Sequence, residues 1–363
     1  GGTTTTRMAA MDIVPLLDRI GEAPAAALIG LVVGLMFGVA AHRSRFCLRA
    51  AVAEFAGGRM GDKVAVWLLT FSTALAWVQA ARLLGLFDPS QARMMAVPGS
   101  WSGAVIGGLM FGAGMILARG CSGRLLVLAA TGNLRSVVSG LIFAVVAQMT
   151  VTGWLAPIKT WAAALWVTPG GRNVDIMAAL GFGDRAGLVL GLGIAALALM
   201  LARRHTIGAS RLIFASGVGF AAAVGWTLTF TLSQAAFDPV QVESLTFTGP
   251  SANMLMFFLD RSAGLEFDIG LIAGVVTGAF LSAALAGELR FQGFEGPTPM
   301  RRAMIGAAMM GFGGMLAGGC AIGAGVSGGS VLAGTAWLAL FCMWVGGGIT
   351  AALLEPRGVP VTA

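Results

Sequence analysis

The sequence contains few charged residues for its length. Asp, Glu, Lys and Arg make up 11% of the 363 residues, against about 25% in ordinary soluble domains. A soluble protein of this size needs a polar surface that so few charges cannot supply. Because 57% of the residues are hydrophobic, the composition excludes a soluble protein and predicts one that is embedded in the lipid bilayer.

Several chemical motifs are absent. The chain has no Walker motif, so we do not expect it to hydrolyse ATP. Its four cysteines form no CxxC pair, and no histidine lies near them at metal-binding spacing. The 19 methionines are scattered, which is typical of residues that fill a core rather than of a copper pathway. We therefore expect no metal and no other cofactor.

Carboxylates are rare in the apolar segments. A proton-coupled carrier often uses a carboxylate inside the membrane, but Glu54 and Asp268 lie only near segment ends. The sequence thus offers no strong candidate for such a residue, and it permits a passive anion channel.

Apolar segments recur along the whole chain, each long enough to cross a hydrocarbon layer of about 30 Å. The predicted spans are 24–41, 64–87, 101–118, 134–155, 185–202, 211–232, 265–287, 302–317 and 333–354. Between them lie shorter pieces that cannot cross alone and that we interpret as re-entrant or interfacial helices: 43–58, 121–132, 157–167, 244–259 and 321–331. The 55 glycines favour a compact bundle with interrupted helices, because small residues let transmembrane helices approach closely.

The basic residues form four clusters between the apolar segments. They are Arg43, Arg45, Arg49, Arg59 and Lys63; Arg119, Arg124 and Arg135; Arg203, Arg204 and Arg211; and Arg290, Arg301 and Arg302. Counting each long segment as one crossing puts all four on one side, which the positive-inside rule makes cytoplasmic. The net charge of +7 is thereby explained without nucleic acid as a partner.

Two stretches of the chain are similar to each other. Residues 107–121 and 306–320 are identical at 8 of 15 positions, where chance gives about one or two, so an internal duplication is expected. A second, weaker similarity, or echo of the first part in the second, aligns residues 44–47 with residues 244–247.

The duplication divides the chain into two transmembrane repeats with a connector between them. The predicted divisions are a disordered tail or expression remnant at 1–20, a first repeat at 21–156, an interfacial connector at 157–183, a second repeat at 184–355 and a C-terminal tail at 356–363.

Each repeat contains a glycine-rich helix that stops at a Gly-Cys pair. The two junctions are Gly120-Cys121-Ser122-Gly123 and Gly319-Cys320-Ala321-Ile322-Gly323. A helix that begins after each cysteine directs its N-terminal amides, with their partial positive charge, at a bound anion. The alternative is a structural glycine crossing with an inert buried cysteine, but the duplication of the junction favours a functional site.

Two further cysteines need separate interpretations. Cys47 lies between Arg45 and Arg49, and such cations attract anions and increase the thiolate fraction; an incidental cysteine in a basic loop is the alternative. Cys342 lies inside the last apolar segment without a glycine break, so we expect a packed core residue.

These motifs together resemble the YeeE/YedE family of bacterial membrane proteins, which includes thiosulfate transporters. The similarity rests on Arg45-Phe46-Cys47-Leu48-Arg49, on the two glycine-cysteine stretches ending at Cys121-Ser122-Gly123 and at Gly319-Cys320, and on Ser244-Leu245-Thr246-Phe247-Thr248-Gly249-Pro250. It extends over nearly the whole chain after the N-terminal tail.

The resemblance implies an all-α, hourglass-shaped fold with inverted pseudo-twofold symmetry and short helices that meet in mid-membrane. It also implies uptake of thiosulfate or a related sulfur anion across the inner membrane, handed between the thiols of Cys47, Cys121 and Cys320. Arg45, Gly120, Ser122, Gly123, Gly319 and Gly323 are expected to line this pathway. The protein is then not an enzyme.

Other functions remain open on the sequence alone. A membrane sulfurtransferase-like protein would form a persulfide on Cys47 or Cys121. A passive anion channel and a transporter of another sulfur or selenium compound are further alternatives. The basic cytoplasmic side also suits a cytosolic sulfur-carrier protein as a partner.

Overall fold

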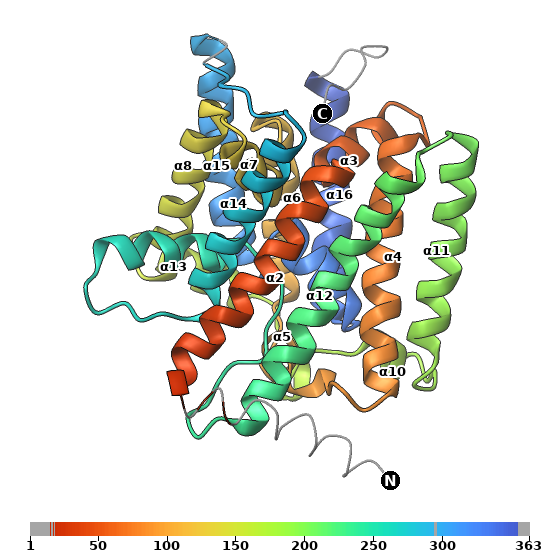
Figure 1. Cartoon of the computed structure of the whole chain (residues 1–363), viewed down its shortest axis with the longest axis vertical. Coiled ribbons are helices and arrows are strands. Elements are labelled where there is room, and N and C mark those ends of the chain that lie inside the picture. The colour runs from red at the N-terminus through yellow and green to blue at the C-terminus, as the bar shows by residue number, and fades with distance from the viewer. Residues whose placement is uncertain (1–14, 16, 18, 294–295, 355–363) are drawn as a thin grey trace.

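The computed structural model describes residues 15, 17, 19–293 and 296–354, and these residues form helices and loops without a β-strand (Figure 1). Within this part of the chain, nine helical segments are long and apolar enough to cross a membrane. Their main helices are α2 (Glu22–Ser44), α4 (Asp62–Leu83), α6 (Trp101–Leu117), α8 (Leu134–Val151), α11 (Ala186–Arg204), α12 (Ala209–Ala235), α14 (Phe267–Leu285), α15 (Pro297–Leu316) and α16 (Gly334–Leu354). The predicted spans are confirmed.

Short helices lie between the long ones, close to the predicted short pieces. They are α3 (Leu48–Ala56), α7 (Ser122–Ala130), α9 (Ala156–Ala164), α13 (Thr248–Leu259) and the π-helical segment η3 (Ala321–Gly328). One boundary differs clearly from the prediction, since α15 begins at Pro297 rather than near 302. Proline is favoured in the first turn of a helix, where its missing N–H is not needed.

The two predicted tails fall largely outside the described residues. Of 1–20, the structure describes 15, 17, 19 and 20, which are helical, and it describes none of 356–363.

The order of long and short helices in the first part of the chain recurs in the second. The order α2, α3, α4, α6, α7, α8 is followed by α12, α13, α14, α15, η3, α16, with α9, α10 (Ile176–Ala179) and α11 between the two sets. Packing recurs as well: α2 packs on α14 as α12 packs on α4, and α6 packs on α16 as α15 packs on α8. The recurring order thus starts at α12, whereas the predicted second repeat starts at 184 and includes α11.

Glycines bring the long helices into backbone contact. A Cβ atom added at Gly34 of α2 would overlap the Leu271 carbonyl oxygen of α14, and one added at Gly274 would overlap the Leu31 carbonyl oxygen. Gly107 of α6 meets the Gly313 carbonyl oxygen of α15 in the same way. The compact bundle expected from the glycine content is therefore present.

Residues from each of the four basic clusters lie at one end of the bundle, which we term the basic end. Arg211, at the start of α12, pairs with Asp62 at 2.8 Å and donates to the Ser44 carbonyl oxygen at 3.0 Å. Arg45 pairs with Glu288 at 3.7 Å. The connection after Glu288 then contacts the turn before α8, where the Leu134 N–H donates to the Gln292 carbonyl oxygen at 3.1 Å.

The opposite end, which we term the acidic end, contains the start of α2, the end of α12 and the start of α14. There the Phe237 N–H donates to Glu22 at 2.6 Å, so α2 and α12 run in opposite directions (Figure 1). Five carboxyl side chains at this end line one cavity: Glu22, Asp238, Glu243, Glu266 and Asp268. The bundle is therefore polarised from end to end.

We expect alanine at Gly34 or Gly274 to lower stability, because the added methyl group pushes against backbone that cannot move aside. Overpacking of this kind costs about 1–3 kcal/mol. Gly140→Ala in α8 is the matched control: nothing lies within 4 Å of its added Cβ, and alanine is the better helix former by about 1 kcal/mol. Thermal unfolding midpoints in detergent should fall for the first two variants and not for the third. Equal midpoints for all three would contradict the close α2–α14 contact.

Candidate functional site

The three cysteines singled out in the sequence occupy the same structural position. Cys47 precedes α3, Cys121 precedes α7, and Cys320 precedes η3, each as the N-terminal capping residue. Two residues before each cysteine, the backbone adopts a left-handed conformation, at Arg45 (φ 52°), Arg119 (φ 56°) and Gly318 (φ 78°). The chain thus ends one helix, turns, and starts a short helix at the thiol, as the sequence predicted for the two Gly-Cys junctions.

The two Gly-Cys junctions match in detail. The Gly120 N–H donates to the Met115 carbonyl oxygen at 3.0 Å, and the aligned Gly319 N–H donates to the Gly314 carbonyl oxygen at 2.9 Å. These bonds reach back over the last turn of α6 and α15, as in a Schellman motif. They satisfy carbonyl groups that a helix end otherwise leaves without a partner.

The three thiols are buried, and Cys121 lies near both of the others. The Cys47 and Cys121 side chains are close enough to interact directly, and Cys121 is also within electrostatic range of Cys320. At Cys320 the sulfur accepts a hydrogen bond of 3.4 Å from the Gly323 N–H. The structure therefore brings the three thiols together inside the bundle.

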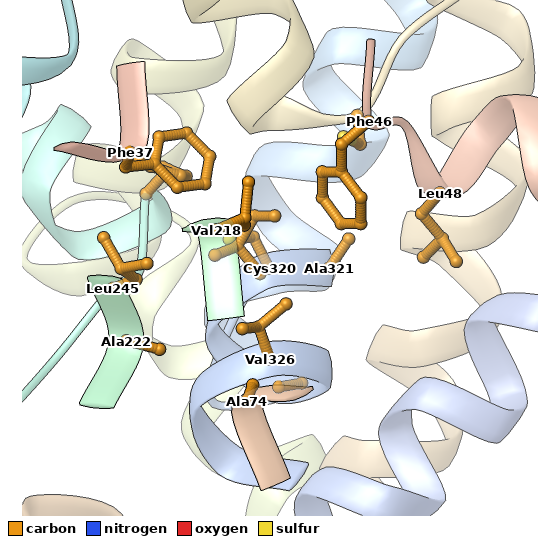
Figure 2. Close-up of a cluster of buried hydrophobic side chains, with 14 of the residues drawn as sticks. Phe37, Phe46, Leu48, Ala74, Val218, Ala222, Leu245, Cys320, Ala321 and Val326 are labelled. Carbon is orange, nitrogen blue, oxygen red and sulfur yellow. The ribbon is translucent and has the colours of Figure 1, made fainter. Parts of the chain in front are cut away.

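Aromatic and aliphatic side chains surround these thiols. Figure 2 shows Phe46, from the turn between α2 and α3, in one buried cluster with Cys320 and Val218. On another side, the rings of Phe37 and Phe247 lie 5.0 Å apart. Phe247 is the N-terminal capping residue of α13, the position that Cys47 has before α3.

The junction glycines admit these neighbours. A Cβ added at Gly123 would lie 3.1 Å from the Phe247 ring, and one at Gly323 would lie 2.5 Å from Thr246 Oγ1. At Gly120 and Gly319 the added Cβ would lie 3.2 Å from Leu125 and 3.0 Å from the Ala324 nitrogen. The pocket next to Gly123, which Phe46 and Arg124 also line, has no room for a water molecule. The centre of the bundle is closed in this structure.

Of the two arginines that flank Cys47 in the sequence, Arg49 lies near the thiol and Arg45 does not. Arg45 has a largely exposed side chain that pairs with Glu288 at the basic end. Two arginines interact electrostatically with the Cys47 thiol, Arg124 more strongly and Arg49 more weakly. The structure therefore brings Arg124 to the thiols, while Arg45 lies at the edge of the site.

Ser122 faces a different space from the thiols. It lines a mostly apolar pocket of about 300 Å³ between α7, α8 and α13, together with Leu125 and Phe258. Its buried hydroxyl has no hydrogen-bond partner among the described residues, and the same is true of Thr248 at the start of α13. Both hydroxyls are available to a polar ligand that approaches the helix starts.

Cys342 has the packing role that the sequence predicted. It is buried in α16, and a Cβ added at Gly108 of α6 would lie 2.8 Å from the Cys342 Cβ. A thiol at this helix crossing fills space between two backbones, apart from the other three.

Sequence reasoning did not single out Phe37, Thr246, Phe247 or Arg124 as site residues. One signal was available, since the echo between 44–47 and 244–247 aligns Phe247 with Cys47. Arg124 could be seen only as a basic residue three positions after Cys121, and Phe37 reaches the site through packing of segments distant in the sequence.

The arrangement suits a small anion that contains sulfur. Helix N-termini present N–H groups and partial positive charge, and Arg124 adds a full charge. Thiols are weak, soft hydrogen-bond donors, so a ligand sulfur would be held loosely next to each of them.

Known proteins with similar sequences are described as transporters of sulfur compounds. A family model described as sulphur transport matches residues 43–349. A protein of Spirochaeta thermophila named thiosulfate transporter TsuA is 30% identical over 338 residues, covering 85% of this chain and 93% of the relative. A protein of the same name from Escherichia coli is 26% identical over 355 residues, covering 88% and 92%. The chain therefore belongs to the sulphur transport family, as its resemblance to the YeeE/YedE proteins predicted, and is a multi-pass membrane protein.

Proposed function

We propose that this protein imports thiosulfate across the bacterial inner membrane along a pathway through Cys320, Cys121 and Cys47. The observation that carries this proposal is that three buried thiols each lie at the start of a short helix. The relatives named as thiosulfate transporters support the substrate. The positive-inside rule makes the basic end cytoplasmic, so the anion meets Cys320 before Cys47.

We further propose that the chain is an internal duplication with inverted symmetry. The sequence identity between 107–121 and 306–320, the recurring helix order and the opposite directions of α2 and α12 support it. In such transporters the substrate site lies at the interface of the repeats and is built from broken helices. The helix pairs α6–α7 and α15–η3, interrupted at Cys121 and Cys320, meet this description as re-entrant elements of an hourglass-shaped protein.

In the proposed mechanism the thiols act as successive weak binding sites. Arg124 and the helix N-termini attract the anion, and each S–H group donates a hydrogen bond to its terminal sulfur. A pathway conducts when each site binds strongly enough to admit the ion and weakly enough to release it. The junction glycines have no side chain and therefore leave room for the anion; they are Gly120, Gly123, Gly319 and Gly323. The rings of Phe46 and Phe247 must rotate out of the pathway for the anion to pass.

The proposal includes a partner at the cytoplasmic side. Thiosulfate that leaves at Cys47 emerges at the basic end, where Arg45 and the other clustered arginines form a positive surface. A cytosolic sulfur-carrier protein with an acidic face is the partner that such a surface favours.

We expect thiosulfate uptake to fall at least about tenfold in each of three variants, Cys47→Ala, Cys121→Ala and Cys320→Ala. Each change removes one hydrogen-bond donor from a series of binding sites. A loss of about 1.4 kcal/mol of binding free energy at one step gives this factor. Cys342→Ala is the control, since this thiol packs between helices. Growth on thiosulfate as the sole sulfur source, in a bacterium without its own sulfate and thiosulfate importers, measures the difference at matched expression. Normal growth of all four variants would rule out the thiol pathway.

We expect no covalent step, because hydrogen bonds suffice to pass the anion between thiols. Intact-mass spectrometry of the purified protein after incubation with thiosulfate should show the unmodified mass. An adduct of one sulfur mass that Cys47→Ala or Cys121→Ala removes would instead support the sulfurtransferase-like function.

A further inference from the structure

A cavity of about 510 Å³ lies at the acidic end of the bundle, away from the thiols. Four elements supply its charged groups. They are Glu22 from α2, Arg93 from α5 (Arg93–Ala96), Asp238 and Glu243 from the connection between α12 and α13, and Asp268 from α14 with Glu266 as its N-terminal capping residue. With five carboxyl groups and one arginine, the cavity repels anions and attracts cations. It is therefore unsuited to thiosulfate and suited to a positively charged ligand.

Asp268 has an unused acceptor inside this cavity. Its side chain is only 7% exposed. One carboxyl oxygen, Oδ2, accepts a hydrogen bond of 2.7 Å from the Asn253 amide. The other, Oδ1, is buried and has no partner within the part of the chain that the structure describes. A buried carboxylate oxygen without a hydrogen-bond partner raises the free energy of the folded protein. A bound proton removes this penalty by neutralising the carboxylate.

Glu243 is the second acidic group of the cavity with an unusual environment. It lies outside the candidate membrane spans, is half-buried, and makes no ion pair with the residues described. Burial, together with the neighbouring Asp268 carboxyl, raises the pKa of Glu243 to about 8, although Arg93 acts in the opposite direction. Burial and a neighbouring carboxyl group both disfavour the charged form, so they favour a bound proton at such a site at neutral pH.

A short buried segment links this cavity to the centre of the bundle. The chain continues from Glu243 through Leu245, whose carbonyl oxygen accepts a 2.5 Å hydrogen bond from Ser327 of η3. The next residue, Thr246, packs directly against Gly323, which donates its N–H to Cys320. A change of charge at Glu243 therefore acts on a segment that touches the thiol site.

We propose that Glu243 and Asp268, with Arg93, form a proton-binding site through which protons accompany the imported anion. The proposal rests on the proposed function, because inward movement of a dianion is opposed by an inside-negative membrane potential and cotransported protons offset that opposition. The proton comes from the outer solution, occupies a carboxyl oxygen of the pair, and is released to the cytoplasm. Only an O–H bond is made and broken.

The test uses the full chain in proteoliposomes with radiolabelled thiosulfate outside and a pH-sensitive dye inside. Wild type should acidify the interior as it takes up thiosulfate. With a titration midpoint near 8, the protonated fraction, and with it the uptake rate, should rise roughly fourfold from about pH 8.5 to pH 6.5. Glu243→Gln and Asp268→Asn should exchange internal for external thiosulfate but lose both acidification and pH dependence. Asp238→Asn, which removes an exposed carboxylate from the same cavity, should behave like wild type.

Infrared difference spectra between low and high pH provide a readout that does not depend on transport or on full activity of a variant. Wild type should show a protonated carboxyl band that disappears on titration and that Glu243→Gln alters. If the band titrates but wild type takes up no thiosulfate, the proton site stands and the proposed function fails. Thiosulfate uptake without acidification, uptake that requires sodium instead of protons, or the lack of a titrating band overturns the proton site and leaves the proposed function intact.

Discussion

Lipid offers no hydrogen-bond partners, so a helix that ends inside the membrane must satisfy its backbone groups within the protein. Each group left without a partner costs several kcal/mol, on the order of a buried polar group in an apolar solvent. In this protein α6 and α15 end at Leu117 and Leu316, next to the buried thiols of Cys121 and Cys320. Bonds from Gly120 and Gly319 back into the last helical turn, and the immediate start of α7 and η3, meet the requirement. The amides of the new helix starts remain directed at the centre of the bundle.

Close packing gives these amides their chemical effect. Contacts such as Gly34 with Leu271, and Gly107 with Gly313, bring helix backbones together and leave a dry centre. In a medium of low polarity, a partial charge and a hydrogen bond both act more strongly than in water. In the proposed pathway, helix N-termini and Arg124 would favour an anion over water, and the soft thiols would favour a sulfur-containing anion over chloride. The cavity that Glu243 lines has the opposite charge, so the proposed anion site and the proposed proton site lie in different parts of the bundle.

The positions of the helices and of the glycine-cysteine junctions could be predicted from the sequence. The contacts between segments distant in the sequence could not. Hydropathy located the long helices, and glycine followed by cysteine located α7 and η3, because both signals are local. Cys342 could be assigned to packing because its neighbours in the sequence are all apolar. Arg124 was visible only as a flanking charge, since its approach to Cys47 depends on how α7 packs against α2. Asp268 was placed correctly near a segment end, but its burial depends on Asn253 of α13 and on the connection that contains Glu243, neither of which the sequence places beside it.

The thiol pathway can be observed most directly by determining a crystal structure with selenosulfate, in which selenium replaces the terminal sulfur of thiosulfate, and locating the selenium by its anomalous scattering. Selenium peaks within contact distance of Cys320, Cys121 or Cys47, on the side where the helix N-termini converge, are the predicted result. Selenium bound only at the exposed arginines of the basic end, or in the pocket beside Ser122 away from all three thiols, would contradict the pathway.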